Sequence, residues 1–231
     1  MDRSEAEISD LEGYVRELIA QVRQGGDAAV RAMTLRFDGV DLGDLPLRVQ
    51  PEEFDRAEEA LPKSLLDAID AAIVNLKKGH ECQLGPSEIR ADIGDGVVVG
   101  ERILPLDSVG LYVPRGKGSF PSVAMMLAIP AKIAGVPRPV IVTPPGPDGR
   151  VDDATLAVAK RIGVEEVYRV GGVQVVAALA YGTESIPRVP KILGPGNAYV
   201  AAAKRALYGV IDPGRSEEHK SELQSPMYLV C

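Results

Sequence analysis

Apolar residues recur every three or four positions through the N-terminal part of the chain, which is the spacing of amphipathic helices. In residues 4–23, for example, Leu11 and Val15 fall on one face together with other aliphatic residues. Gly25-Gly26 interrupts this pattern, and Asp27 is placed to cap the helix that follows. The pattern predicts helices over residues 4–23, 27–37 and 63–78, with another starting at Pro51.

Near Pro105 the pattern changes to short apolar runs that alternate with helical segments. Strands that alternate with helices of about ten residues predict a parallel, doubly wound sheet with right-handed crossovers. We therefore expect an α/β fold, in which a mainly helical segment (residues 1–105) precedes an incomplete Rossmann-like domain (residues 106–214). The predicted strands are residues 94–104, 108–113, 140–143, 164–170 and 191–193, and the predicted helices are residues 121–134, 153–162, 173–180 and 198–207.

The composition of the 231 residues is that of an ordinary soluble globular protein, with 45% hydrophobic and 26% charged residues. A net charge of −7 without a basic stripe argues against nucleic acid and anionic membranes as partners. The acidic N-terminus lacks the apolar stretch of a secretory signal, and no apolar run approaches the roughly 20 residues of a membrane span. Cys82 and Cys231 show no paired spacing, so a reducing, cytoplasmic location fits best.

Two glycine turns stand between an apolar run and a helical segment, Gly171-Gly172 and Gly194-Pro195-Gly196. A strand, a glycine turn and a helix start place backbone N–H groups at the carboxyl edge of a sheet, where such folds bind anions and nucleotides. Each turn is followed by an uncharged amide, Gln174 or Asn197, which can donate and accept hydrogen bonds. The alternative is that the glycines only tighten the turns and the amides only cap helices, and both interpretations stay open at this point.

The loop after residues 108–113 holds Arg115 and Lys117 among glycines, which predicts either a phosphate contact or a solvated basic turn. The dinucleotide fingerprint GxGxxG, with an acidic residue about 20 positions later, is missing. A nucleotide would therefore have to be held in a non-standard way. His80 has only Glu81 near it at ligand spacing, so we expect a histidine at a helix end rather than a metal ligand.

The phrases VGGVQVVAALAYGTESIP (residues 170–187) and KILGPGNAYVAAAK (residues 191–204) closely resemble the histidinol dehydrogenase family. VRQGGDAAVRAMTLRFDGVDL (residues 22–42) is similar to the N-terminal segment of that family, and the resemblance extends to about residue 212. It implies the aldehyde dehydrogenase-like fold of these enzymes. It also implies an NAD- and zinc-dependent oxidation of histidinol to histidine through the aldehyde, by a cytoplasmic homodimer.

The resemblance assigns Tyr112, Gln174 and Asn197 to the cofactor side of the enzyme. The commoner family loop reads VPGG, so Arg115 departs from it at a glycine position. The similar phrase HEAQ lies outside the family's zinc site, and it has a small residue where this chain has Cys82. That similarity predicts a small packing residue at Cys82.

The resemblance places the catalytic Glu-His pair and the zinc ligands (a Gln, two His and an Asp) beyond residues 1–214, so no catalytic or metal residue is expected within them. Residues 215–231 leave the family pattern and resemble non-native, adapter-derived sequence, and His219 with its neighbouring glutamates is not expected to bind metal. The chain is thus expected to be an inactive N-terminal fragment. Two alternatives are a related zinc and NAD dehydrogenase of another small alcohol, such as a sulfonated diol, and a non-catalytic nucleotide-binding module.

Overall fold

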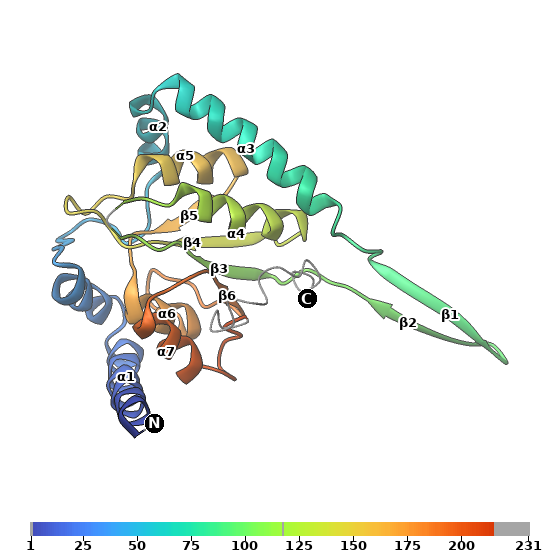
Figure 1. Ribbon diagram of the computed structural model, residues 1–231, viewed down its shortest axis with the longest axis horizontal. Coiled ribbons are helices and arrows are strands. Elements are labelled where there is room, and N and C mark those ends of the chain that lie inside the picture. Colours follow the sequence, from blue (N-terminus) through green and yellow to red (C-terminus); the bar gives the residue numbers. More distant parts are fainter. Residues whose placement is uncertain (1, 117, 215–231) are drawn as a thin grey trace.

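The computed structural model describes residues 2–116 and 118–214 (Figure 1). The predictions for Lys117, for the tail at residues 215–231 and for His219 and Cys231 within it fall outside the described residues. No helix in the described part of the chain is long and apolar enough to cross a membrane.

A four-stranded parallel sheet forms the centre of the fold, in the order β5-β4-β3-β6. The strands are β3 (Ser108–Tyr112), β4 (Arg138–Val142), β5 (Glu166–Tyr168) and β6 (Ile192–Leu193). Gly110 of β3 pairs with Val140 on one side and with Ile192 on the other. Successive strands move outward from β3 to β5, and the chain then returns to the opposite side of β3. This order confirms the predicted doubly wound fold and places its switch point between β3 and β6, where such sheets bind ligands.

Side chains alternate between the two faces of the sheet, and each face has its own core. Ile141 packs with the helices α4 (Pro121–Ile133) and α5 (Asp153–Ile162), whereas Val140 and Val142 pack toward α6 (Gly172–Tyr181) and α7 (Ala198–Ala206). The expected βα units are therefore present, with helix bounds within two residues of the prediction. Tyr112 belongs to the core on the side of α6 and α7.

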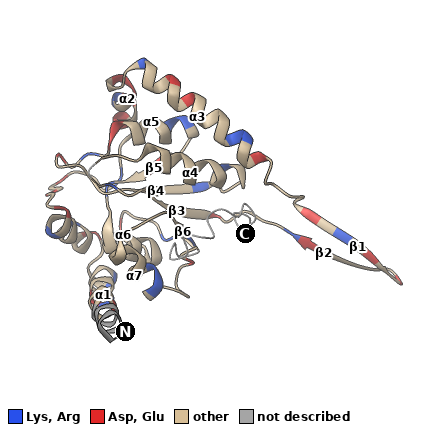
Figure 2. Ribbon diagram, viewed as in Figure 1, with Lys and Arg blue, Asp and Glu red and all other residues tan. Residues whose placement is uncertain are grey.

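The N-terminal helices extend both layers (Figure 1). Helix α1 (Asp2–Asp38) packs against α6 and α7, α2 (Pro51–Ala60) against α5, and α3 (Lys63–Glu81) against α4. Figure 2 shows acidic and basic residues interspersed along α2, α3 and α5. Helix α5 forms ion pairs with both α2 and α3. The division of the chain near Pro105 stays a prediction.

A bend at Gly26, which has φ +53°, divides α1 where the glycine pair predicted a break. Asp27 was expected to cap the second half of this helix. Its carboxylate instead accepts hydrogen bonds from Thr183 and Ser185, while its N–H donates to Glu184 at 2.7 Å. The bend is thus held by the loop at residues 183–185, which is distant in sequence, and the predicted cap is wrong.

The strand predicted over residues 94–104 corresponds to β2 (Val97–Arg102). It pairs antiparallel with a second strand, β1 (Glu88–Gly94), to form a hairpin. The two residues of its turn, Asp95 and Gly96, both have positive φ, as a type I′ turn requires. Every residue of the hairpin is exposed, and it extends away from the body of the molecule (Figure 1). The Asp-Gly pair was the sequence signal that could have identified this turn.

Candidate cofactor site

Tyr112 lies at the carboxyl end of β3, between the two glycine turns. Its hydroxyl accepts a hydrogen bond from the N–H of Gly172 at 3.2 Å. Its carbonyl oxygen would be only 2.1 Å from a Cβ built on Gly194, which has φ +113°. One tyrosine therefore contacts both turns, by its side chain at the first and by its backbone at the second.

The Tyr112 side chain is 4% exposed. Burial raises the pKa of Tyr112 to about 12, and the N–H of Gly172 and the charge of Asp38 act on it more weakly, in opposite directions. The phenol therefore keeps its proton at neutral pH. This hydroxyl makes no other hydrogen bond to the described residues, so its own proton has no acceptor among them.

Gln174 lies in the first turn of α6 and is fully buried. Its Nε2 donates to Asp38 Oδ2 at 3.3 Å, whereas its Oε1 has no hydrogen-bond partner among the described residues. Gly172 has φ +62°, and a Cβ there would be 2.4 Å from Oε1. The glycine therefore makes room for the amide of Gln174, so this amide is not simply a helix cap.

Asp38 ends helix α1 and is exposed as a residue, but its carboxyl group is turned toward Gln174. Burial of the carboxyl raises the pKa of Asp38, and the hydrogen bond from Gln174 opposes this shift. Nothing in the sequence marked Asp38 as part of the site, because its partner lies on a different element far along the chain.

Asn197 lies at the second turn and is exposed. Its Oδ1 accepts a hydrogen bond from the N–H of Val200 at 3.0 Å, as an N-cap residue does. The capping interpretation is therefore correct for the side-chain oxygen of Asn197. Its NH₂ group makes no hydrogen bond to the described residues. Lys204 on the same helix donates to the carbonyl of Gly194 and holds the turn against α7.

Arg115 lines a depression of about 300 Å³ near the loop that follows β4. Its described lining carries as many aspartates as arginines, so the arginine charges are balanced. This balance favours the interpretation of a solvated basic turn over a phosphate contact at Arg115. The lining residues are Arg56, Ala60, Arg115, Asp148, Arg150, Val151, Asp152 and Asp153.

Arg169, which follows β5, is a fully buried charge that no sequence pattern singled out. Its guanidinium binds both carboxylate oxygens of Glu53, one of them at 3.1 Å, and donates to the carbonyl of Gly149 at 3.3 Å. Burial of Glu53 is the largest single influence and raises its pKa. The hydrogen bonds from Arg169 and from the N–H of Gln50, with the charges of Arg169 and Arg56, together outweigh burial and hold the pKa of Glu53 below its usual value. This pair ties α2 to the segment that leads into the first glycine turn.

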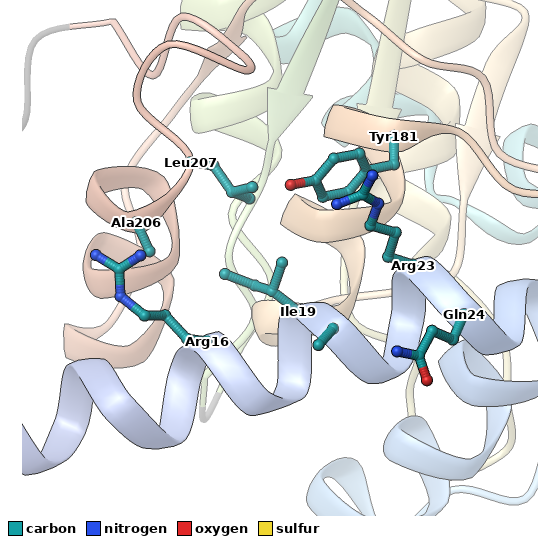
Figure 3. Close-up of a pocket in the computed structure, with 8 residues that line it drawn as sticks. Arg16, Ile19, Arg23, Gln24, Tyr181, Ala206 and Leu207 are labelled. Carbon is teal, nitrogen blue, oxygen red and sulfur yellow. The ribbon is translucent and has the colours of Figure 1, made fainter.

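A larger groove of about 410 Å³ lies between α1 and the C-terminal ends of α6 and α7 (Figure 3). The guanidinium of Arg23 lies over the ring of Tyr181, 4.9 Å from its centroid. Because Tyr181 ends α6 whereas Gln174 lies in its first turn, this groove is separate from the glycine turns.

The described residues hold no group of three or more His, Cys, Asp or Glu side chains that could bind a metal ion. His80 lies at the end of α3, with Nδ1 3.0 Å from Gln83 Oε1, as expected for a helix-end histidine. Cys82 is exposed, with its Sγ 3.1 Å from the carbonyl of Lys78. The prediction that Cys82 is a packing residue is therefore wrong.

Comparison with known proteins finds one family over nearly the whole chain. A family profile described as histidinol dehydrogenase matches residues 1–217. The histidinol dehydrogenase homolog of Rhizobium meliloti is 48% identical over 212 residues, which are 92% of this chain and 46% of that protein. The histidinol dehydrogenase of Synechocystis sp. is 45% identical over 212 residues, 92% of this chain and 49% of that protein.

A crystal structure of histidinol dehydrogenase from Elizabethkingia anophelis superposes with a TM-score of 0.82 at 32% identity. The match covers 87% of this chain and 46% of that one. The chain thus spans about half the length of the curated relatives it matches.

Proposed function

The chain belongs to the histidinol dehydrogenase family, and we propose that it provides the cofactor side of an NAD-dependent enzyme that oxidises histidinol to histidine through the aldehyde. The observation that carries the proposal is the position of Tyr112 between two glycine turns at the switch point of the sheet. NAD bound there would supply the chemistry of this reaction as the hydride acceptor of both oxidations. In this proposal the enzyme is cytoplasmic.

The residues present fit a nucleotide with uncharged hydrogen-bonding groups. Tyr112 offers an uncommitted O–H, Gln174 an uncommitted amide oxygen, and Asn197 an exposed NH₂ group. Gly172 is partly exposed to solvent, and it contacts the buried side chains of both Tyr112 and Gln174. We therefore assign these three side chains to cofactor binding, with Asn197 as the contact that needs no rearrangement.

The described residues do not fit the zinc of this enzyme class, since they contain no suitable ligand group. We propose that the zinc ligands and the acid and base lie in the part of the relatives that this chain does not match. The 231-residue chain alone should then bind NAD without turning over histidinol.

The experiment has two arms on the purified chain. Titration calorimetry with NAD should give saturable binding that Asn197→Ala and Tyr112→Phe weaken, and absorbance should show no reduction of NAD when histidinol is added. Exposed Asp44→Asn is the matched control and should bind as the unaltered chain does. Absence of NAD binding would contradict the assignment of the cofactor side, and reduction of NAD would contradict the inactivity.

A second candidate is a related dehydrogenase that acts on another small alcohol, such as a sulfonated diol. The observation that favours it is the loop after β3, which departs from the commoner loop of the family at Arg115. Ligand-observed NMR with histidinol and with a sulfonated diol would distinguish the two. Preferential saturation of the sulfonated diol would favour the second candidate.

For assembly we infer a homodimer of the enzyme as a whole. The hairpin supports the presence of some covering partner, since Ile89, Ile93 and Val98 on it are all more than half exposed, and an isolated two-stranded hairpin has marginal stability in water. Light scattering after size exclusion would measure the assembly. A monodisperse monomer would favour a self-contained nucleotide-binding module.

A further inference from the structure

The two ends of the Gln174 amide lie in different surroundings. Nε2 donates to Asp38 Oδ2 at 3.3 Å, whereas Oε1 is buried and accepts nothing from any described residue. A carboxylate can only accept hydrogen bonds, so a charged Asp38 determines which end of the amide carries the nitrogen. The oxygen is consequently held on the side away from Asp38.

The oxygen held in this way faces the start of α6. A Cβ on Gly172 would be 2.4 Å from Oε1 and 3.1 Å from Nε2, so the oxygen is the end nearer to the turn. Buried polar atoms nearly always have a hydrogen-bond partner. An unpaired acceptor on a fully buried side chain, beside a helix N-terminus, points to a partner outside the described residues, and a bound ligand is such a partner.

Tyr112 provides a complementary group at the same glycine. Its hydroxyl lies 3.2 Å from the Gly172 nitrogen and donates to no other described residue. A hydroxyl proton and an amide oxygen, both without a partner among the described residues, therefore lie next to Gly172. Together they match a ligand group that can both donate and accept.

We propose that Asp38 is a positioning residue that makes this site select a hydroxyl or a carboxamide over a phosphate. A helix N-terminus by itself favours anions. Here the charge of Asp38 and the oriented oxygen of Gln174 both disfavour a phosphate oxygen. The inference rests on the proposed function, since the nicotinamide riboside part of NAD carries hydroxyls and a carboxamide, whereas its pyrophosphate part has no donor.

The test compares nicotinamide riboside with inorganic pyrophosphate as ligands of the 231-residue chain, by titration calorimetry. The unaltered chain should prefer the riboside. Asp38→Asn should reduce this preference about tenfold or more, because a neutral amide can pair with either end of Gln174 and no longer fixes the oxygen. Asp44→Asn removes the same charge from an exposed position nearby and should leave the preference unchanged. Asp38→Glu, which keeps the charge, should restore part of it.

An unchanged preference in Asp38→Asn, or an equal loss in Asp44→Asn, would overturn the proposal. So would a preference of the unaltered chain for pyrophosphate. Circular dichroism of each variant would show whether a loss of binding reflects a loss of folding, and the rescue by Asp38→Glu would distinguish positioning from a structural role.

A spectroscopic readout separates this inference from the proposed function. The side-chain amide signals of Gln174, observed by ¹⁵N NMR, should move in Asp38→Asn and on addition of riboside, but not in Asp44→Asn. If NAD binds and these signals do not respond to Asp38→Asn, the positioning role is wrong and the proposed function stands. If the signals respond to Asp38→Asn but neither NAD nor the riboside binds, the proposed function and the ligand selection by Asp38 are both wrong, and Asp38 only orients the amide of Gln174.

Discussion

The turn before α6 and the turn before α7 share a glycine pair, a preceding strand and a following amide, yet the two amides have different roles. Asn197 is exposed and uses its oxygen to cap α7, whereas Gln174 is buried and keeps its oxygen unpaired. The difference comes from what packs on each turn. The end of α1 brings Asp38 to the first turn and binds the nitrogen of Gln174, so the amide of that residue cannot rotate to satisfy its own oxygen.

The glycines of the two turns differ as well. At Gly194 the close neighbour is backbone, the carbonyl of Tyr112, whereas at Gly172 it is the end of the Gln174 side chain. A side chain can move more cheaply than a strand. Glycine is therefore required more strictly at Gly194 than at Gly172, where the neighbouring side chain can move.

The largest effect is expected for Gly194→Ala. The new methyl group would lie 2.1 Å from a backbone oxygen at φ +113°, so the free energy of unfolding should fall by about 3–5 kcal/mol. Urea denaturation would measure it. Gly13→Ala, in open space on α1, is the control and should be neutral or stabilising by about 0.5–1 kcal/mol. A Gly194→Ala variant as stable as this control would contradict the strict requirement for glycine at the second turn.

Arg169→Met tests the ion pair that leads into the first turn. It removes the guanidinium from the buried carboxyl of Glu53, which then keeps only the N–H of Gln50 and the longer ion pair with Arg56. The substitution should cost about 3 kcal/mol at neutral pH. Because Arg169 holds the pKa of Glu53 below its usual 4.5, the stability that Glu53 contributes is present above that pH and is lost as the pH falls through the lowered pKa. The difference between the variant and the unaltered chain should therefore shrink in acid. A difference that is constant with pH in thermal or urea unfolding would contradict this account.

Gly172→Ala should destabilise less than Gly194→Ala, by about 1–3 kcal/mol, from its positive φ and its contact with Gln174. Part of this loss comes from a side chain, so a second substitution, Gln174→Ala, should partly relieve it. A double-mutant cycle measures this coupling. Strict additivity of the two substitutions would indicate that the backbone conformation alone demands glycine at this turn.

The smallest effects distinguish the two amides directly. Asn197→Ala removes an N-cap and should cost about 1 kcal/mol. Gln174→Met removes both a hydrogen bond and an unpaired buried oxygen while keeping the volume, so the net change should be smaller, within about 0.5 kcal/mol of zero. Comparable losses in both variants would mean that the oxygen of Gln174 has a partner in the folded chain.

Most of the α/β elements could be predicted because the signals that determine them are local. Asp152 caps α5 by accepting from the N–H of Thr155 at 2.9 Å, and Gly163 ends that helix in the left-handed conformation. Helix α5 consequently has the predicted bounds. The same reasoning missed β1, although its apolar residues at positions 89, 91 and 93 alternate with charged residues as in a half-buried strand. In the structure both faces of this strand are exposed.

The candidate site could be located only in part from the sequence. The two glycine turns and the amides after them were visible as a pattern, and the family resemblance added Tyr112. That Tyr112 contacts both turns could not be predicted, because this depends on how β3 lies between the two connections. The roles of the three residues toward NAD stay predictions.

The sequence by itself determined the alternation of strands and helices, the two glycine turns and the family, since these depend on neighbours along the chain. Only the tertiary structure decided that Arg169 is paired with Glu53, 116 positions away, and Gln174 with Asp38, 136 positions away. The physical reason is that a buried polar group must find its partner wherever packing provides one. Local spacing carries no record of such a partner, and the packing of α1 and α2 on the two faces of the sheet supplied both.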